Sequence, residues 1–254
     1  MRQANLMLHC GANKVEAADL LSVPTPEATK SWTPIPHAEL LAGVMGTLQR
    51  SGLEIVSQSH GITKEGNRYF GLLQVANGHQ DDDFGLIVGL RNSHDKMFPA
   101  GLVVGASVFV CDNLSFSGEV TLARKHTAYI RRDLPQLITA AVGKLGSLRQ
   151  TQDARFSAYR GASITDLQAH DLVIRSLDAG VLPVTRIPAV LGEWRKPSHP
   201  EFAPRNAWSL FNCFSEVLKG QLDYLPRRTQ ALHGLLDTAC GLHDARQAVI
   251  ANPV

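Results

Sequence analysis

Five short runs rich in β-branched, aromatic and leucine residues follow one another through the middle of the 254-residue chain. Turns bearing Gly, Asn or Asp separate these runs, and short runs bounded by such residues are typical of β-strands. Consecutive short strands pair most economically with their neighbours along the chain. The pattern therefore predicts an antiparallel meander of about five strands, at residues 54–59, 69–75, 84–90, 102–110 and 119–123.

Apolar residues recur at helical spacing on both sides of the predicted meander. Before it, the pattern from Leu40 to Leu48 predicts a helix that ends at Gly52. After it, we expect one helix with Asp133 as its N-cap and another that begins near a capping box at residues 163–166. An irregular, proline-rich crossing and two more helices, at 206–219 and 227–240, complete the chain. The predicted fold class is α+β: an N-terminal helix, a meander and a helical C-terminal half.

The predicted domain organisation is a single α+β domain over residues 34–254. The helix and the meander occupy 34–130, and the helical part occupies 131–254. A chain of this length can bury one large core. Residues 1–33 show no sustained period, and Pro24 and Pro26 interrupt their last third. We expect these residues to form a loose N-terminal arm.

The chain carries four cysteines that lie far apart and form no C-x-x-C pair, which disfavours a zinc ribbon and a secreted disulfide framework. No segment approaches the roughly 18 consecutive apolar residues of a membrane helix. No basic start followed by an apolar run opens the sequence. We therefore expect a cytoplasmic protein with reduced thiols and no membrane partner.

Three polar groups follow three of the predicted strands, at the points where those strands end. The first group is Arg91, Asn92, Ser93, His94, Asp95 and Lys96, the second is Cys111, Asp112 and Asn113, and the third is Arg124, Lys125, His126 and Thr127. In an antiparallel meander, the first and third of these strands end at one end of the sheet, and the second ends at the other. Simple pairing thus works against one site shared by all three groups, unless bulges or returning loops bring them together.

Two interpretations of these groups stay open. Imidazole and carboxylate side chains suit a divalent metal or acid–base catalysis near neutral pH, and the candidates for such a site are His94, Asp95, Asp112 and His126. Their spacing matches no metal-binding motif, and adjacent residues of a strand point to opposite faces. In the other interpretation, the Asn, Asp and Ser side chains satisfy backbone groups in tight turns, which we favour for each residue taken singly.

Between residues 120 and 160 the chain has eight Lys and Arg residues against two Asp, although the whole chain has a net charge of only +2. Positive charge interleaved with aromatic rings suits single-stranded nucleic acid, because the charge follows the phosphates and the rings stack on bases. The alternative is a solvated basic helix whose aromatic side chains face the core. The candidate nucleic-acid contacts are Arg124, Lys125, Tyr129, Arg131, Arg132, Arg155, Tyr159 and Arg160.

The sequence from Phe84 through the first polar group, residues 108–113 (Val-Phe-Val-Cys-Asp-Asn) and residues 125–127 (Lys-His-Thr) resembles a family of phage/plasmid-like proteins, domain of unknown function 932. Residues 208–216 (Trp-Ser-Leu-Phe-Asn-Cys-Phe-Ser-Glu) are similar to that family's C-terminal signature. The resemblance covers most of the chain after the arm and implies a cytoplasmic protein of bacterial, viral or plasmid origin, connected with mobile DNA. It transfers no activity and no catalytic residue. The order of helix, meander and helix is also similar to the core of single-strand annealing proteins of phages and eukaryotes.

We therefore expect a nucleic-acid-binding protein of phage or plasmid DNA metabolism, with single-stranded DNA as its partner and strand annealing or strand protection as its role. We also expect a homo-oligomer that needs no cofactor. Two alternatives remain. One is a metal-dependent hydrolase or nuclease in which the four His and Asp candidates hold a divalent metal, and the other is a structural or interaction protein without catalytic activity. Whether the protein is an enzyme is thus open.

Overall fold

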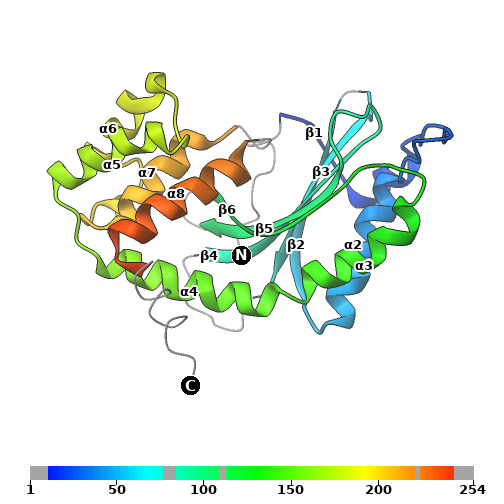
Figure 1. Ribbon diagram of the computed structural model, residues 1–254, viewed down its shortest axis with the longest axis horizontal. Coiled ribbons are helices and arrows are strands. Elements are labelled where there is room, and N and C mark those ends of the chain that lie inside the picture. Colours follow the sequence, from blue (N-terminus) through cyan, green and yellow to red (C-terminus); the bar gives the residue numbers. More distant parts are fainter. Residues whose placement is uncertain (1–10, 64, 77–83, 109–112, 221–223, 243–254) are drawn as a thin grey trace.

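The computed structural model describes residues 11–63, 65–76, 84–108, 113–220 and 224–242 (Figure 1). Its strands form one antiparallel sheet in which each strand pairs with its neighbours along the chain. The α+β class and the antiparallel meander are therefore confirmed. The strands are β1 (Asn13–Val15), β2 (Ile55–Ile62), β3 (Arg68–Val75), β4 (Phe84–Ser93), β5 (Ala100–Val108) and β6 (Asn113–Arg124).

The strand that the sequence did not predict, β1, comes from the N-terminal arm. Asn13 pairs with Ile62, so β1 adds an edge to the sheet next to β2. The short 3₁₀-helix η1 (Ala17–Ser22) follows it and buries Leu20. The described part of the arm thus packs against the rest of the chain. The predicted boundary between the arm and the domain, after residue 33, stays a prediction.

One face of the sheet is covered by α2 (His37–Arg50) and α3 (Ile130–Val142) (Figure 1). Side chains alternate between the two faces along each strand. Those of Leu73, Val88 and Leu102 point to this face, where they join Val44 of α2 and Ile138 of α3 in one buried cluster. The predicted helix that ends at Gly52 is confirmed as α2.

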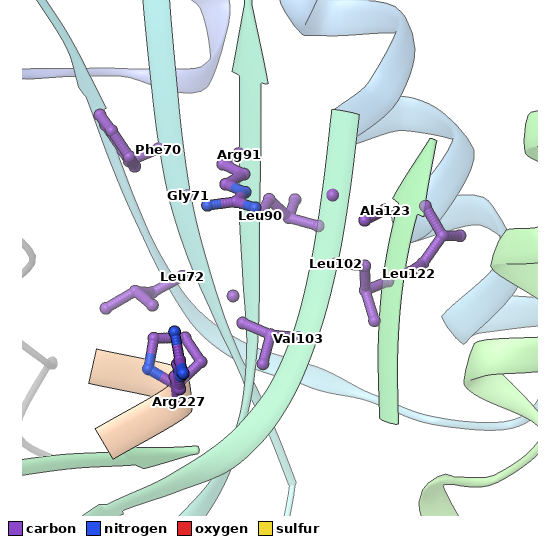
Figure 2. Close-up of a pocket in the computed structure, with 13 residues that line it drawn as sticks. Phe70, Gly71, Leu72, Leu90, Arg91, Leu102, Val103, Leu122, Ala123 and Arg227 are labelled. Atoms are coloured by element: carbon purple, nitrogen blue, oxygen red, sulfur yellow. The ribbon is translucent and has the colours of Figure 1, made fainter. Parts of the chain in front are cut away.

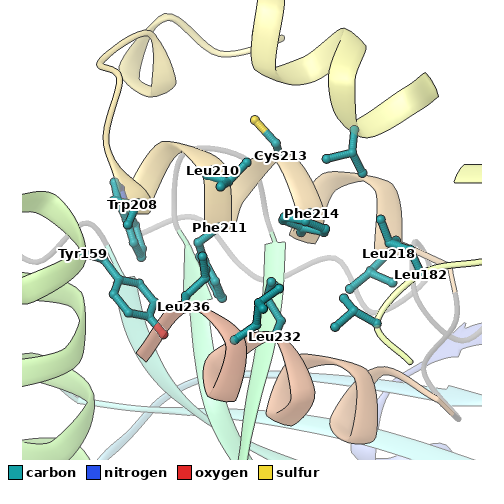
Figure 3. Packing of buried hydrophobic residues seen from close by; sticks show 14 of the residues in the cluster. Tyr159, Leu182, Trp208, Leu210, Phe211, Cys213, Phe214, Leu218, Leu232 and Leu236 are labelled. Atoms are coloured by element: carbon teal, nitrogen blue, oxygen red, sulfur yellow. The ribbon is translucent and has the colours of Figure 1, made fainter. Parts of the chain in front are cut away.

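The remaining helices form a second layer, most of which packs on the other face. They are α4 (Leu145–Gly161), α5 (Asp166–Asp178), η2 (Val184–Arg186), α6 (Ile187–Arg195), η3 (Pro200–Phe202), α7 (Ala207–Leu218) and α8 (Leu225–Ala239). Figure 3 shows Phe211 and Phe214 of α7 packed near Tyr159 of α4 and Leu232 of α8. None of the helices in the described parts of the chain is long and apolar enough to cross a membrane.

Three details of the helices differ from the prediction. The helix α3 begins at Ile130, so Asp133 lies in its first turn and is not its N-cap. The capping box of α5 joins Thr165 to Gln168, two residues after the predicted pair, because Thr165 has the extended backbone of an N-cap residue. In the proline-rich crossing, α6 forms because its proline lies in the first turn, where proline is tolerated.

A buried ion pair joins α4 to α8. The Nε atom of Arg155 lies 2.9 Å from Oδ1 of Asp237, and its Nη2 atom lies 2.9 Å from Oδ2. The hydroxyl of Tyr159 donates a hydrogen bond to the same carboxylate at 2.7 Å. Burial raises the pKa of Tyr159, and the adjacent Asp237 charge adds to this effect, so the phenol stays a neutral donor. Both side chains of the pair are less than 5% exposed, which makes the pair part of the core.

We predict that Arg155→Met lowers the free energy of unfolding by about 3–5 kcal/mol, because it leaves the buried Asp237 charge without its ionic partner. The double variant Arg155→Met with Asp237→Leu is expected to recover part of this loss, since it removes both charges together. Urea denaturation of both variants and the unchanged protein measures the difference. An Arg155→Met variant that is as stable as the unchanged protein would contradict a structural role for this pair.

Candidate functional site

Two of the three polar groups converge at one end of the sheet. Ser93 ends β4 opposite Arg68, and Arg124 ends β6 opposite Ala100. The backbone of Asn113 pairs with Val108, at the opposite end of β5 and β6. The strand order therefore separates the second group from the other two, as antiparallel pairing predicts. Cys111 and Asp112 lie outside the described residues.

Asn92 is the centre of a buried hydrogen-bond network at this end of the sheet. Its Nδ2 atom donates to the Ile35 carbonyl at 2.7 Å and to Nδ1 of His37 at 2.9 Å. Its Oδ1 atom accepts from Nε2 of His126 at 2.8 Å. Flipping the amide would place an oxygen against the Ile35 carbonyl, so the network itself assigns its orientation. Through Asn92, the start of α2 is tied to the ends of β4 and β6.

Each histidine of this network donates a hydrogen bond through its Nε2 atom. His37 accepts from Asn92 at Nδ1, so its Nε2 atom carries the proton that it donates to the Gly66 carbonyl at 2.9 Å. The ring of His37 stacks on that of His94, with centroids 3.9 Å apart and planes inclined by 8°. The Nε2 atom of His94 donates to Ile35, at 2.9 Å. Each ring thus has a hydrogen-bond acceptor at its protonated Nε2 atom.

Burial keeps two of these rings from becoming charged. It lowers the pKa of His37 to about 4; the hydrogen bond to Gly66 opposes this change, and His94 and His126 add to it. Burial, followed by the influence of His94, also lowers the pKa of His126 to about 4. The network therefore stabilises the fold only while both rings remain neutral.

A second polar pair lies beside the network on the same face. The Nδ1 atom of His60 lies 3.0 Å from the hydroxyl of Tyr69, whose ring centroid is 5.5 Å from that of His37. Gly71 makes this placement possible, because a Cβ atom there would overlap the Tyr69 hydroxyl. Burial also lowers the pKa of His60, so a line of neutral polar side chains crosses β2 and β3.

The loop after β4 is held by its own polar side chains. Ser93 donates to Asp95 at 2.6 Å and accepts from the backbone N–H of Met97 at 3.0 Å. Arg68 donates to the other oxygen of Asp95 at 2.6 Å. Although burial opposes it, the hydrogen bonds from Ser93 and Arg68 lower the pKa of Asp95. The turn interpretation is thus confirmed for Ser93 and Asp95.

Arg91 lies on the opposite face of β4 from Asn92, because adjacent strand residues alternate. There it lines a pocket of about 240 Å³ on the face that points away from α2 and α3 (Figure 2). Its guanidinium carbon lies 5.4 Å from the centre of the Phe98 ring, and that ring packs on Phe70 with centroids 5.5 Å apart. The loop after β4 therefore places an aromatic ring against Arg91.

The pocket combines a mostly apolar lining with two arginines. Figure 2 shows Phe70, Leu72, Val103 and Arg91 on the sheet and Arg227 at the start of α8. Gly89 and Gly101 also line it, so part of its floor is backbone. The two arginines are the charged residues among the described lining residues of the pocket.

Several of the predicted nucleic-acid contacts lie exposed around the start of α3. Lys125 is exposed, and Tyr129 is 60% exposed with the Arg132 guanidinium 4.6 Å from its ring centre. The Nη1 atom of Arg131 donates to both carboxylate oxygens of Glu39 in α2, at 2.8 and 2.7 Å. The half-buried Arg124 donates to Asp133 at 2.6 Å.

The other three predicted contacts lie on α4. Arg160 is exposed, with its guanidinium 5.0 Å from the centre of the Trp208 ring. Arg155 and Tyr159, in contrast, are buried with Asp237 in the helical core. A nucleic acid at the surface cannot reach these two side chains in this structure, so we do not retain them as contacts. Their helical spacing is that of a core-facing stripe.

Of the four metal candidates, the structure brings two together. His94 and His126 belong to the Asn92 network, whereas Asp95 is engaged by Ser93 and Arg68. Asp112 lies outside the described residues. Within the described parts of the chain, no group of three or more His, Cys, Asp or Glu residues is arranged to hold a metal ion. A metal site that includes Asp112 stays a prediction.

Comparison of the chain with protein-family models, with curated proteins and with solved structures finds no match in any of the three. The resemblance to domain of unknown function 932 therefore rests on the sequence segments alone and stays an expectation.

Sequence reasoning did not find several residues of these two sites. His37 follows a proline at the start of a predicted helix, and nothing in its position indicates a contact with Asn92, 55 residues later. Arg227 lies at the start of the last predicted helix, far along the chain from Arg91. Adjacent residues of a strand point to opposite faces of the sheet, so the strand pattern could have shown that Arg91 and Asn92 belong to different sites.

We predict that the free energy of unfolding falls as the pH drops from about 6.5 to about 4. The ordinary pKa of histidine, about 6.5, applies in the unfolded chain, and burial lowers the pKa values of His37 and His126 to about 4 in the folded protein. Between these values the unfolded chain binds more protons, so acid favours it. Each histidine contributes up to about 1.4 kcal/mol per pH unit.

The variant His126→Gln isolates this effect, because an amide N–H can still donate to Asn92 but does not titrate. Urea denaturation at stepped pH is expected to give a shallower loss of stability than in the unchanged protein. Identical slopes for the two proteins would show that His126 is not kept neutral by the fold.

Proposed function

We propose that this protein binds single-stranded nucleic acid on the sheet face that carries Arg91, beside the start of α8. The observation that supports this proposal is the pocket in which Arg91 and Arg227 border a mostly apolar floor. A guanidinium group donates hydrogen bonds to phosphate oxygens in pairs, and an apolar surface accommodates the face of a base. The pocket therefore suits a ligand that is anionic at one end and flat and apolar at the other.

The exposed residues after β6 extend this basic surface in the proposal. Lys125 comes two residues after Ala123, which lines the pocket. Beyond it lie Tyr129 and Arg132, an exposed ring with a guanidinium against it. Arg131, Arg124 and Arg132 all have carboxylate partners, so they contribute less net positive charge than their number suggests. On this side we therefore retain Lys125 first, together with the Tyr129 ring and the Arg132 guanidinium that lies against it.

The sequence resemblance adds the biological setting to this proposal. Proteins connected with phage or plasmid DNA encounter single strands during replication and recombination, so strand annealing or strand protection fits the proposed activity. A homo-oligomer would place several copies of the site along one strand. The buried Asn92 network supports a structural role for the other face of β4, and the proposal assigns it no contact with the ligand.

Binding of a labelled thymidine oligonucleotide, followed by fluorescence anisotropy at several salt concentrations, tests this function. We predict that Arg91→Gln and Arg227→Gln each weaken binding about tenfold or more at low salt, because each removes a charged donor to phosphate. Each substitution is also expected to lower the magnitude of the negative slope of log affinity against log salt concentration by about 0.7.

The matched control is Arg195→Gln, which removes one positive charge from an exposed position at the end of α6, outside the pocket. It is expected to bind as the unchanged protein does. Thermal melts establish that all three variants are folded. Absence of binding at low salt, or equal losses in the control and the pocket variants, would overturn the proposed function.

A further inference from the structure

We infer that the pocket holds a single unpaired base, with the phosphate of the same nucleotide between Arg91 and Arg227. This inference rests on the proposed function and specifies how the strand is recognised. Sites for drug-sized ligands usually have volumes of roughly 300–1,000 Å³. At about 240 Å³ this pocket is smaller, so it suits one planar group and not a stack of several.

The sheet makes room for a flat group at this point. In the row of paired residues that crosses the strands here, Arg91 lies opposite Gly101, and Gly101 lies opposite Ala123. In the next row on the same face, Gly89 lies opposite Val103. Gly89, Gly101 and Ala123 all line the pocket, and the Arg91 side chain crosses Gly101 at the edge of its floor.

The position of Arg91 depends on the same floor. A Cβ atom at Gly101 would lie 3.2 Å from Nε of Arg91 and 3.2 Å from the Leu122 carbonyl oxygen, so the arginine stem lies directly over this glycine. The Phe98 ring flanks its guanidinium group. Arg91 is therefore held at the edge of the floor, where its charge can meet a phosphate while the base lies on the apolar surface.

An unpaired base fits this arrangement and a duplex does not. In a duplex the bases are stacked and paired inside, so only the phosphates reach a protein surface without distortion of the helix. A duplex would engage the two arginines but leave the apolar floor exposed to water. The apolar floor thus adds binding energy only for a single strand, and the sequence of that strand matters little because every base has a flat face.

The experiment compares two strands of equal length and charge: a thymidine oligonucleotide and its fully abasic counterpart. We expect the unchanged protein to bind the thymidine strand about tenfold more tightly, because stacking of one base is worth about that factor. The variant Ala123→Leu fills the floor from an exposed position at its rim. It is expected to abolish the preference for the thymidine strand, so that the variant binds the two strands equally.

The control is Ala140→Leu, which adds the same side chain at an exposed position of α3, away from the pocket. Its affinities for both strands should equal those of the unchanged protein. Equal binding of the thymidine and abasic strands by the unchanged protein would overturn the base pocket while leaving the proposed function intact. Failure to bind either strand would overturn both.

Discussion

The hydrogen bonds of Asn92 join three parts of the chain that are distant in sequence. Its amide contacts Ile35 and His37 at the start of α2, and it accepts from His126 just after β6. Asn92 is fully buried, so each of these groups would lose a partner and gain none from water if the amide were absent. The layer of α2 and α3 on one face of the sheet depends on this connection.

The same interaction determines what the other face can do. Because Asn92 must point into the closed layer, Arg91 must point to the opposite face, where α8 leaves a pocket beside it. Hydrogen bonds of Ser93 and Asp95 then turn the chain so that Phe98 reaches the Arg91 guanidinium. One short polar segment thus combines a structural residue, a turn and a candidate ligand contact. The dense polar composition of residues 91–96 is explained by this division of roles.

Much of the fold follows from local sequence patterns. The alternation of short strands and turns predicts the meander, and antiparallel pairing predicts that the groups after β4 and β6 meet while Asn113 lies at the far end. What local patterns do not contain is the identity of distant partners. Arg155 and Tyr159 have the composition of a basic, aromatic surface, yet Asp237, some 80 residues later, draws them into the core. The neutral state of His37 and His126 likewise depends on burial, which only the assembled layers create.

The most direct measurement of the central claim is photo-crosslinking of a thymidine strand that carries 4-thiothymidine, with mass-spectrometric identification of the linked peptides. We expect crosslinks to the pocket residues of β3, β4 and β5 and to the start of α8, including the peptides that contain Phe70 and Arg227. We expect none to the buried network around Asn92. Crosslinks confined to α2 and the exposed side of α3, with the pocket peptides unlabelled, would contradict it.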